Sequence, residues 1–83
     1  MYYQKQMVEV IALFDRDGKI IPLEIIWIDQ KRYSIDKVLS KTRVPSRTGG
    51  LLVERYCILV EGQQRYLYYQ KEGEKWFVEK MVK

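Results

Sequence analysis

Hydrophobic and polar positions alternate with a period of two over most of this chain. In Val8–Phe14, one side of the alternation consists of Val8, Val10, Ala12 and Phe14. The other side consists of Glu9, Ile11 and Leu13, together with the preceding Met7. This period is typical of a β-strand, because successive side chains point to opposite faces. Similar runs rich in β-branched and aromatic residues occupy Lys19–Asp29, Arg32–Leu39, Leu51–Glu61, Arg65–Gln70 and Lys75–Met81. A helical period of 3.6 is not sustained anywhere in the chain.

Turn signals separate these runs about every ten residues. They are Asp15-Arg16-Asp17-Gly18, Asp29-Gln30-Lys31, Gly62-Gln63-Gln64 and Lys71-Glu72-Gly73-Glu74. The spacing predicts an all-β fold, a single small antiparallel meander or barrel of five to six strands with little or no helix. One domain spans residues 1–83, since 83 residues leave no room for a second. Residues 1–6 are expected to fray or to add an edge strand.

Two irregularities predict that the sheet is strongly bent. Pro22 cannot donate a hydrogen bond to a ladder, which favours a bend at this point of the strand. Tyr33 and Ile35 share a face, but Val38 is out of step with them. A bulge near Asp36-Lys37 would restore the phase. The block Ile20–Leu39 is therefore expected to form the bent scaffold around which the other strands pack.

The chain lacks the residues that most catalytic and metal-binding sites require. The chain has no histidine and one cysteine, which excludes His-dependent nucleophilic pairs and ordinary zinc sites. Asp15-x-Asp17-Gly18 resembles the start of a calcium loop. Without the further oxygen ligands it is better explained as a hairpin turn. Gly49-Gly50 lacks the Lys-Ser/Thr of a phosphate loop. We expect no enzyme, no metal and no cofactor.

Three further residues stand out within apolar runs. Glu24 and Glu54 interrupt such runs, and they are the carboxylates that a search for acid–base chemistry would inspect first. Cys57 lies in an apolar strand, where a small core residue is expected. A lone cysteine fits a reducing compartment, and no apolar run approaches the ~20 residues of a membrane helix. The protein is therefore expected to be cytoplasmic and not bound to membranes.

Charge is concentrated in the middle of the chain. The formal net charge is +4, and residues 30–65 carry eight basic and three acidic side chains. The connection Ser40–Gly50 is expected to be a long polar loop. Clustered cations favour a polyanionic partner, and nearby tyrosines could stack on unpaired bases. The candidate nucleic-acid site comprises Lys37, Lys41, Arg43, Arg47, Arg55, Arg65, Tyr66 and Tyr68. A solvated basic loop that binds nothing is the alternative explanation.

A second hypothesis is a module for protein interaction or homodimerisation. Both faces of Val8–Phe14 and Ile20–Ile28 carry more apolar side chains than one small barrel interior can hold. The surplus would be left exposed as an association patch, or an unprotected terminal strand would pair edge to edge with a second copy.

The order of motifs resembles a group of small bacterial β proteins. The matching residues are Val8-Glu9-Val10, Asp17-Gly18, Trp27, Lys31-Arg32-Tyr33-x-Ile35, Val38-Leu39 and Trp76. The chain carries Gln30 where that group commonly has a turn glycine, and its fourth strand lacks a tryptophan. Some members are encoded beside lesion-bypass DNA polymerases. The resemblance therefore implies an accessory role in DNA repair, with nucleic acid or a DNA-associated protein as partner, and it implies no catalytic residue.

Overall fold

The computed structural model describes residues 2–46 and 52–82, and these form seven antiparallel strands. The strands are β1 (Tyr2–Phe14), β2 (Ile20–Ile26), β3 (Arg32–Ser34), β4 (Lys37–Pro45), β5 (Leu52–Val60), β6 (Gln63–Gln70) and β7 (Lys75–Val82). The all-β class predicted from the alternation is confirmed. No helix in the described part of the chain is long and apolar enough to cross a membrane.

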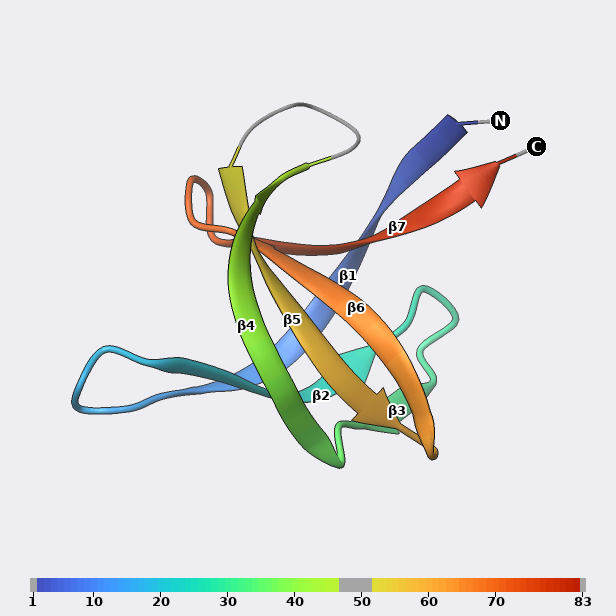
Figure 1. Ribbon diagram of the computed structural model, residues 1–83. Coiled ribbons are helices and arrows are strands. Elements are labelled where there is room, and N and C mark those ends of the chain that lie inside the picture. Colours follow the sequence, from blue (N-terminus) through green and yellow to red (C-terminus); the bar gives the residue numbers. More distant parts are fainter. Residues whose placement is uncertain (1, 47–51, 83) are drawn as a thin grey trace.

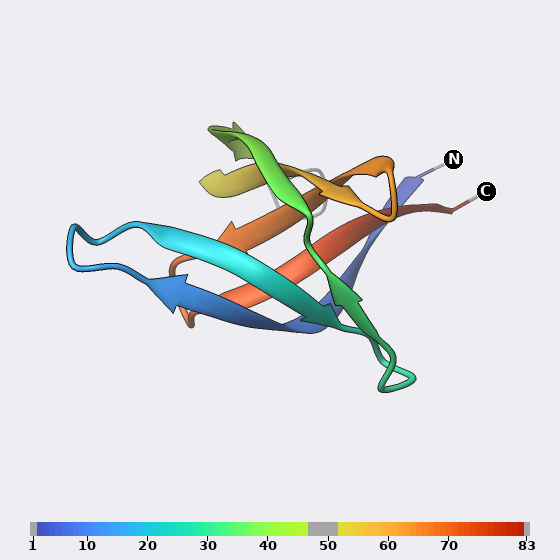
Figure 2. The ribbon, with the colours of Figure 1, turned by 90° about the horizontal axis from the view of Figure 1, so that it is seen from below.

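The strands form one sheet in the order β3-β2-β1-β7-β6-β5-β4, curled into a half-barrel (Figures 1 and 2). Its two outermost strands, β3 and β4, are consecutive in the sequence and are joined only by Ile35 and Asp36. The N–H of Ile35 donates to the carbonyl of Leu23 at 2.9 Å, and that of Asp36 donates to the carbonyl of Leu59 at 2.8 Å. This junction thus ties β2 to β5 and holds the two ends of the sheet together.

The main core fills the concave side of the half-barrel. Its buried residues are Ile25, Tyr56, Ile58, Leu67, Tyr69 and Trp76. Half-buried side chains from β1, β2, β4, β5 and β7 pack against them, together with Trp27 and Ile35, which lie between strands. The ring of Trp76 lies between those of Tyr56 and Tyr69, with centroids 5.6 and 4.7 Å away. Large rings bury much area each, which is how so short a chain builds a core without disulfides.

A second, smaller cluster lies on the opposite face of β5, β6 and β7. Tyr68 and Phe77 are cross-strand partners whose rings stack at 5.2 Å with an interplanar angle of 8°. Val53 is buried with them, and the ammonium of Lys5 sits 4.5 Å from the centre of the Phe77 ring. This part of the sheet is therefore buried on both faces.

Two sequence-based expectations are corrected by the strand bounds, and a third is decided between its alternatives. Seven strands form instead of five or six, because the segment predicted as Arg32–Leu39 is divided at Ile35 and Asp36. Of the two alternatives for the N-terminal residues, fraying or an added strand, residues 2–6 follow the second: they belong to β1 and pair with β7. The basic connection starting at Ser40 is strand as far as Pro45, because it pairs with β5 from Lys37 onward. This strand was not recognised from the sequence because most of its side chains are polar and exposed, and Val38 and Val44 are its half-buried residues.

Both predicted irregularities exist. The β1–β2 register shifts between Ile11 and Ala12, next to the Pro22 partner, as a bend at that proline requires. The second shift falls between Val38 and Ser40, later than the predicted position near Asp36-Lys37. Ile35 and Val38 nevertheless both pack against the main core, because the chain passes from β3 to β4 between them, at Ile35 and Asp36. The hairpin-turn interpretation of Asp15 is also confirmed: its Oδ1 accepts from the N–H of Asp17 at 2.9 Å and of Lys19 at 2.8 Å.

Candidate functional site

An opening between β6 and β7 is the principal hollow of the described structure. The two strands form a ladder only where Tyr68, Tyr69 and Gln70 pair with Phe77, Trp76 and Lys75. Beyond this point the rest of β6 pairs only with β5, and the rest of β7 pairs only with β1. Figures 1 and 2 both show β6 and β7 separating from this short ladder.

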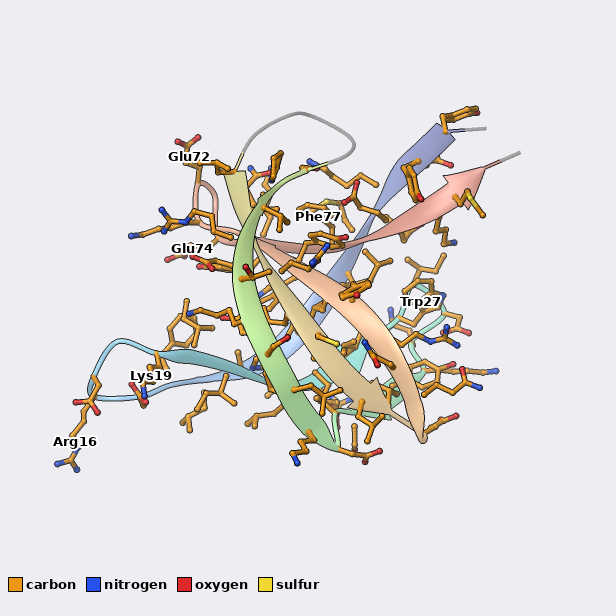
Figure 3. The ribbon with its side chains drawn as sticks, in the orientation of Figure 1. Arg16, Lys19, Trp27, Glu72, Glu74 and Phe77 are labelled. Carbon is orange, nitrogen blue, oxygen red and sulfur yellow. The ribbon has the colours of Figure 1, made fainter. Side chains whose placement is uncertain are left out.

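A cleft of about 690 Å³ occupies this opening. Its apolar lining comes from the concave side of the sheet and comprises Ile25, Ile58, Val60 and Val78. The polar lining includes Glu61, Gln63, Gln64, Arg65, Glu79 and Lys80. Five tyrosines and tryptophans complete the lining: Tyr3, Trp27, Tyr33, Tyr66 and Tyr68. Of these, Trp27 also packs against the main core. Figure 3 shows Trp27 on the side of the molecule where the opening lies.

Cations in and beside the cleft lie over aromatic rings. The ammonium of Lys80 is 5.2 Å from the centre of the Trp27 ring, and the guanidinium of Arg55 is 4.6 Å from that of Tyr66. Arg65 donates to the side-chain oxygen of Gln63. Neither Arg65 nor Lys80 is within ion-pair distance of a carboxylate in residues 2–46 and 52–82. Their charge is therefore available to an anionic ligand.

The structure brings four of the eight predicted site residues together here. Arg65, Tyr66 and Tyr68 line the cleft, and Arg55 lies over the ring of Tyr66. Alternation places Arg55, Tyr66 and Tyr68 on the outer face of the sheet, whereas Arg65 shares the inner face with Leu67. The group thus surrounds the mouth of the cleft from both faces.

The other predicted cations lie elsewhere. Lys37, Lys41 and Arg43 are on β4, which is at the far end of the sheet from β7. Lys41 lies over the Tyr56 ring at 5.7 Å, and Arg43 pairs with Glu54 at 3.4 Å. Arg47 falls outside the described residues. The described cations therefore do not form one continuous basic stripe.

The two predicted tyrosines differ in accessibility. Tyr66 is 46% exposed, whereas Tyr68 is 5% exposed and stacked on Phe77. Of this pair, only Tyr66 presents its ring to a ligand at the surface. Burial of Tyr68 could not be read from the strand pattern, because it depends on the second cluster behind the sheet.

Sequence reasoning missed Trp27, Tyr33 and Lys80 as site residues. Trp27 was noted only as part of an apolar strand, and it both packs against the main core and lines the cleft. Lys80 shares its side of β7 with Trp76 and Val78, so the period of two places a cation on the inner face. That alternation was a usable signal. The divergence of β6 from β7 had no counterpart in the sequence.

The two carboxylates singled out from the sequence are in ion pairs. Glu24 lies 3.3 Å from Nε of Arg32, and Glu54 pairs with Arg43 as described above. Cys57 is buried, as expected for a core residue. No group of three or more potential metal-ligating side chains is found within the described ranges.

No family model, curated protein or solved structure matches this chain. The resemblance to small bacterial β proteins stays a prediction, and the cleft itself is the basis for a function.

Proposed function

We propose that this protein is a non-enzymatic accessory module that binds nucleic acid at the β6–β7 cleft. The observation that carries the proposal is the pairing of accessible rings with cations that have no described carboxylate partner. Lys80 lies over Trp27, Arg55 lies over Tyr66, and Arg65 also lines the cleft. The implied DNA-repair context is consistent with this function and is part of the proposal.

The residue types supply the two parts of such a site. Arg and Lys neutralise phosphates and release counterions, which makes binding sensitive to salt. Rings supply stacking of about 1–3 kcal/mol per base and tolerate any sequence, because every base has an aromatic face. Of the described cations, Arg65 and Lys80 line the cleft and Arg55 lies beside it, so the salt dependence should be moderate. Affinity should therefore depend on the rings as well as on charge.

Fluorescence anisotropy with labelled oligonucleotides tests the proposal. Binding is expected at ~50 mM salt and should weaken as salt rises. Arg65→Gln and Lys80→Gln should each weaken binding several-fold and reduce the salt slope by about 1. Lys37→Gln and Lys41→Gln are matched controls, because they remove the same charge from β4. Absence of salt-sensitive binding, or equal losses in all four variants, would contradict a site in this cleft.

Self-association is a second candidate function, and one observation favours it. The β1–β2 hairpin projects from the half-barrel (Figures 1 and 2), and it exposes Ile11, Leu13, Phe14 and Leu23. Its neighbouring Glu24 is neutralised by Arg32. Ile11 and Leu13 share one face of β1, and Phe14 lies on the other. An apolar patch at Ile11 and Leu13 can pair with its own copy, as a two-fold interface requires.

Sedimentation distinguishes this candidate from a monomeric binding module. A dimer is expected at ~100 μM, and Leu13→Lys should convert it to monomer. Leu52→Lys is the matched control, since Leu52 is an exposed leucine on β5. A monomer at this concentration would exclude self-association as the function.

A further inference from the structure

The turn between β5 and β6 determines which backbone groups face the cleft. Glu61 and Gly62 both have positive φ, 51° and 75°, as in a two-residue hairpin turn of the type favoured between antiparallel strands. The residues that flank such a turn, here Val60 and Gln63, form a hydrogen-bonded pair. The register of the whole β5–β6 ladder follows from this pair.

Hydrogen-bonded and non-hydrogen-bonded pairs alternate along an antiparallel ladder. Gln63 and Arg65 therefore direct their N–H and C=O groups toward β5, whereas Gln64 and Tyr66 direct theirs away from it. Tyr68, the next residue in this series, pairs with Phe77 of β7. At Gln64 and Tyr66 β7 has already separated, so their peptide groups face the cleft.

The cleft beside the peptide groups of Gln64 and Tyr66 suits a flat ring with a polar edge. Its lining is apolar toward the core, at Ile58 and Val78, and Trp27 and Tyr33 add ring surfaces. The volume of about 690 Å³ lies within the ~300–1,000 Å³ typical of sites that enclose small organic groups. A nucleobase has apolar faces for such walls, and its edge carries donors and acceptors for the peptide groups of β6.

We infer that the cleft takes one unstacked base of a single strand, whose edge bonds to the peptide groups of Gln64 and Tyr66. This inference rests on the proposed function and specifies its ligand as single-stranded nucleic acid. In a duplex, the faces of the bases are stacked and their pairing edges are occupied, so a base would first have to be extruded. Arg65 and Lys80 at the mouth are placed to contact the flanking phosphates.

Proline at position 64 tests the role of the backbone. Gln64→Pro removes the N–H that faces the cleft and leaves the ladder to β5 intact, which is where proline is tolerated in a strand. Gln64→Ala is the matched control, because it shortens the same side chain and keeps the N–H. Thermal unfolding of both variants establishes that the fold is retained.

The binding assay uses labelled single strands of about 12 nucleotides, within the usual range for small β folds, and the same sequence as a duplex. The single strand is expected to bind at least ~10-fold more tightly, a difference of about 1.4 kcal/mol. Gln64→Pro should weaken this binding about 5-fold or more, and by clearly more than Gln64→Ala, which keeps the N–H.

Other outcomes distinguish failure of this inference from failure of the proposed nucleic-acid binding. Equal affinity for the duplex and the single strand overturns the inference and leaves nucleic-acid binding standing. A Gln64→Pro variant that folds and binds like wild type overturns the contact to the peptide group. A third outcome is that an extended acidic peptide binds more tightly than the oligonucleotide, competes with it and loses its binding in Gln64→Pro. This outcome would contradict a bound nucleobase and would indicate that a peptide strand pairs with the free edge of β6. If neither oligonucleotide binds, the proposed function fails as well.

Discussion

The phenol of Tyr56 donates a hydrogen bond to the backbone carbonyl of Ile20 at 2.8 Å. This contact joins β5 to β2 across the concave side of the half-barrel, between residues 36 positions apart. Tyr56 is almost fully buried, and Ile20 is half-buried. The bond holds the two halves of the curled sheet together.

Tyr56→Phe should therefore lower the free energy of unfolding by about 1–2 kcal/mol, because a partly buried acceptor loses its donor. Urea denaturation with unchanged m-value measures this loss. Tyr66→Phe is the control: its ring is exposed, and its free energy of unfolding should stay near that of wild type.

Alkaline pH should weaken the fold through the same residue. Burial, and then the charges of Glu54 and Tyr69, raise the pKa of Tyr56 from 10 to about 12. The unfolded chain loses this proton first, so the stabilisation is complete below pH 10 and is lost as pH rises toward 12. Thermal unfolding between pH 8 and pH 12 should show a steeper decline in wild type than in Tyr56→Phe. Equal slopes would show that Tyr56 does not contribute.

Tyr66 and Tyr68, which lie two positions apart on β6, should respond differently to truncation. Tyr68→Ala removes a ring stacked on Phe77 and should cost about 3–5 kcal/mol of stability. Tyr66→Ala should change stability by less than about 0.5 kcal/mol and should weaken oligonucleotide binding. Denaturation and anisotropy on the two variants separate the structural ring from the binding ring. A large loss of stability in Tyr66→Ala would contradict its assignment to the cleft surface.

Gln30 is a site for stabilisation. It has φ of 70° in the turn between β2 and β3, where its N–H donates to the carbonyl of Trp27 at 2.9 Å. A side chain in this left-handed region is strained, so Gln30→Gly should stabilise the protein by about 0.5–1 kcal/mol. Gly18→Ala, at φ of 84°, should have the opposite effect. A fall in melting temperature for Gln30→Gly would show that its backbone is not strained.

The sequence predicted local features well, because each has a local cause. Alternation predicted the strands, the loss of a donor at Pro22 predicted a bend, and the phase slip before Val38 predicted an irregularity close to where it lies. Gly18 and Asp15 predicted a hairpin turn. These features depend on residues a few positions apart.

The site was predicted only in part, because it depends on contacts between distant strands. Arg65 and Tyr66 were identified from composition, but Trp27 and Lys80 meet over 53 positions of sequence. The basic residues on β4 resemble a loop in the sequence because most side chains of this strand are exposed, although its backbone pairs with β5. The divergence of β6 from β7 follows from the curl of the whole sheet. No short stretch of sequence encodes it.

Intrinsic tryptophan fluorescence tests the central claim most directly, since it reports on the cleft itself. Trp27 lines the cleft, whereas Trp76 is buried between Tyr56 and Tyr69. Titration with a single-stranded oligonucleotide at ~50 mM salt should quench the emission of wild type to saturation, because a base stacks beside Trp27. Trp27→Phe should remove this quenching and leave the emission of Trp76. Saturable binding with the quenching retained in Trp27→Phe, or no binding at all, would contradict a nucleic-acid site in the β6–β7 cleft.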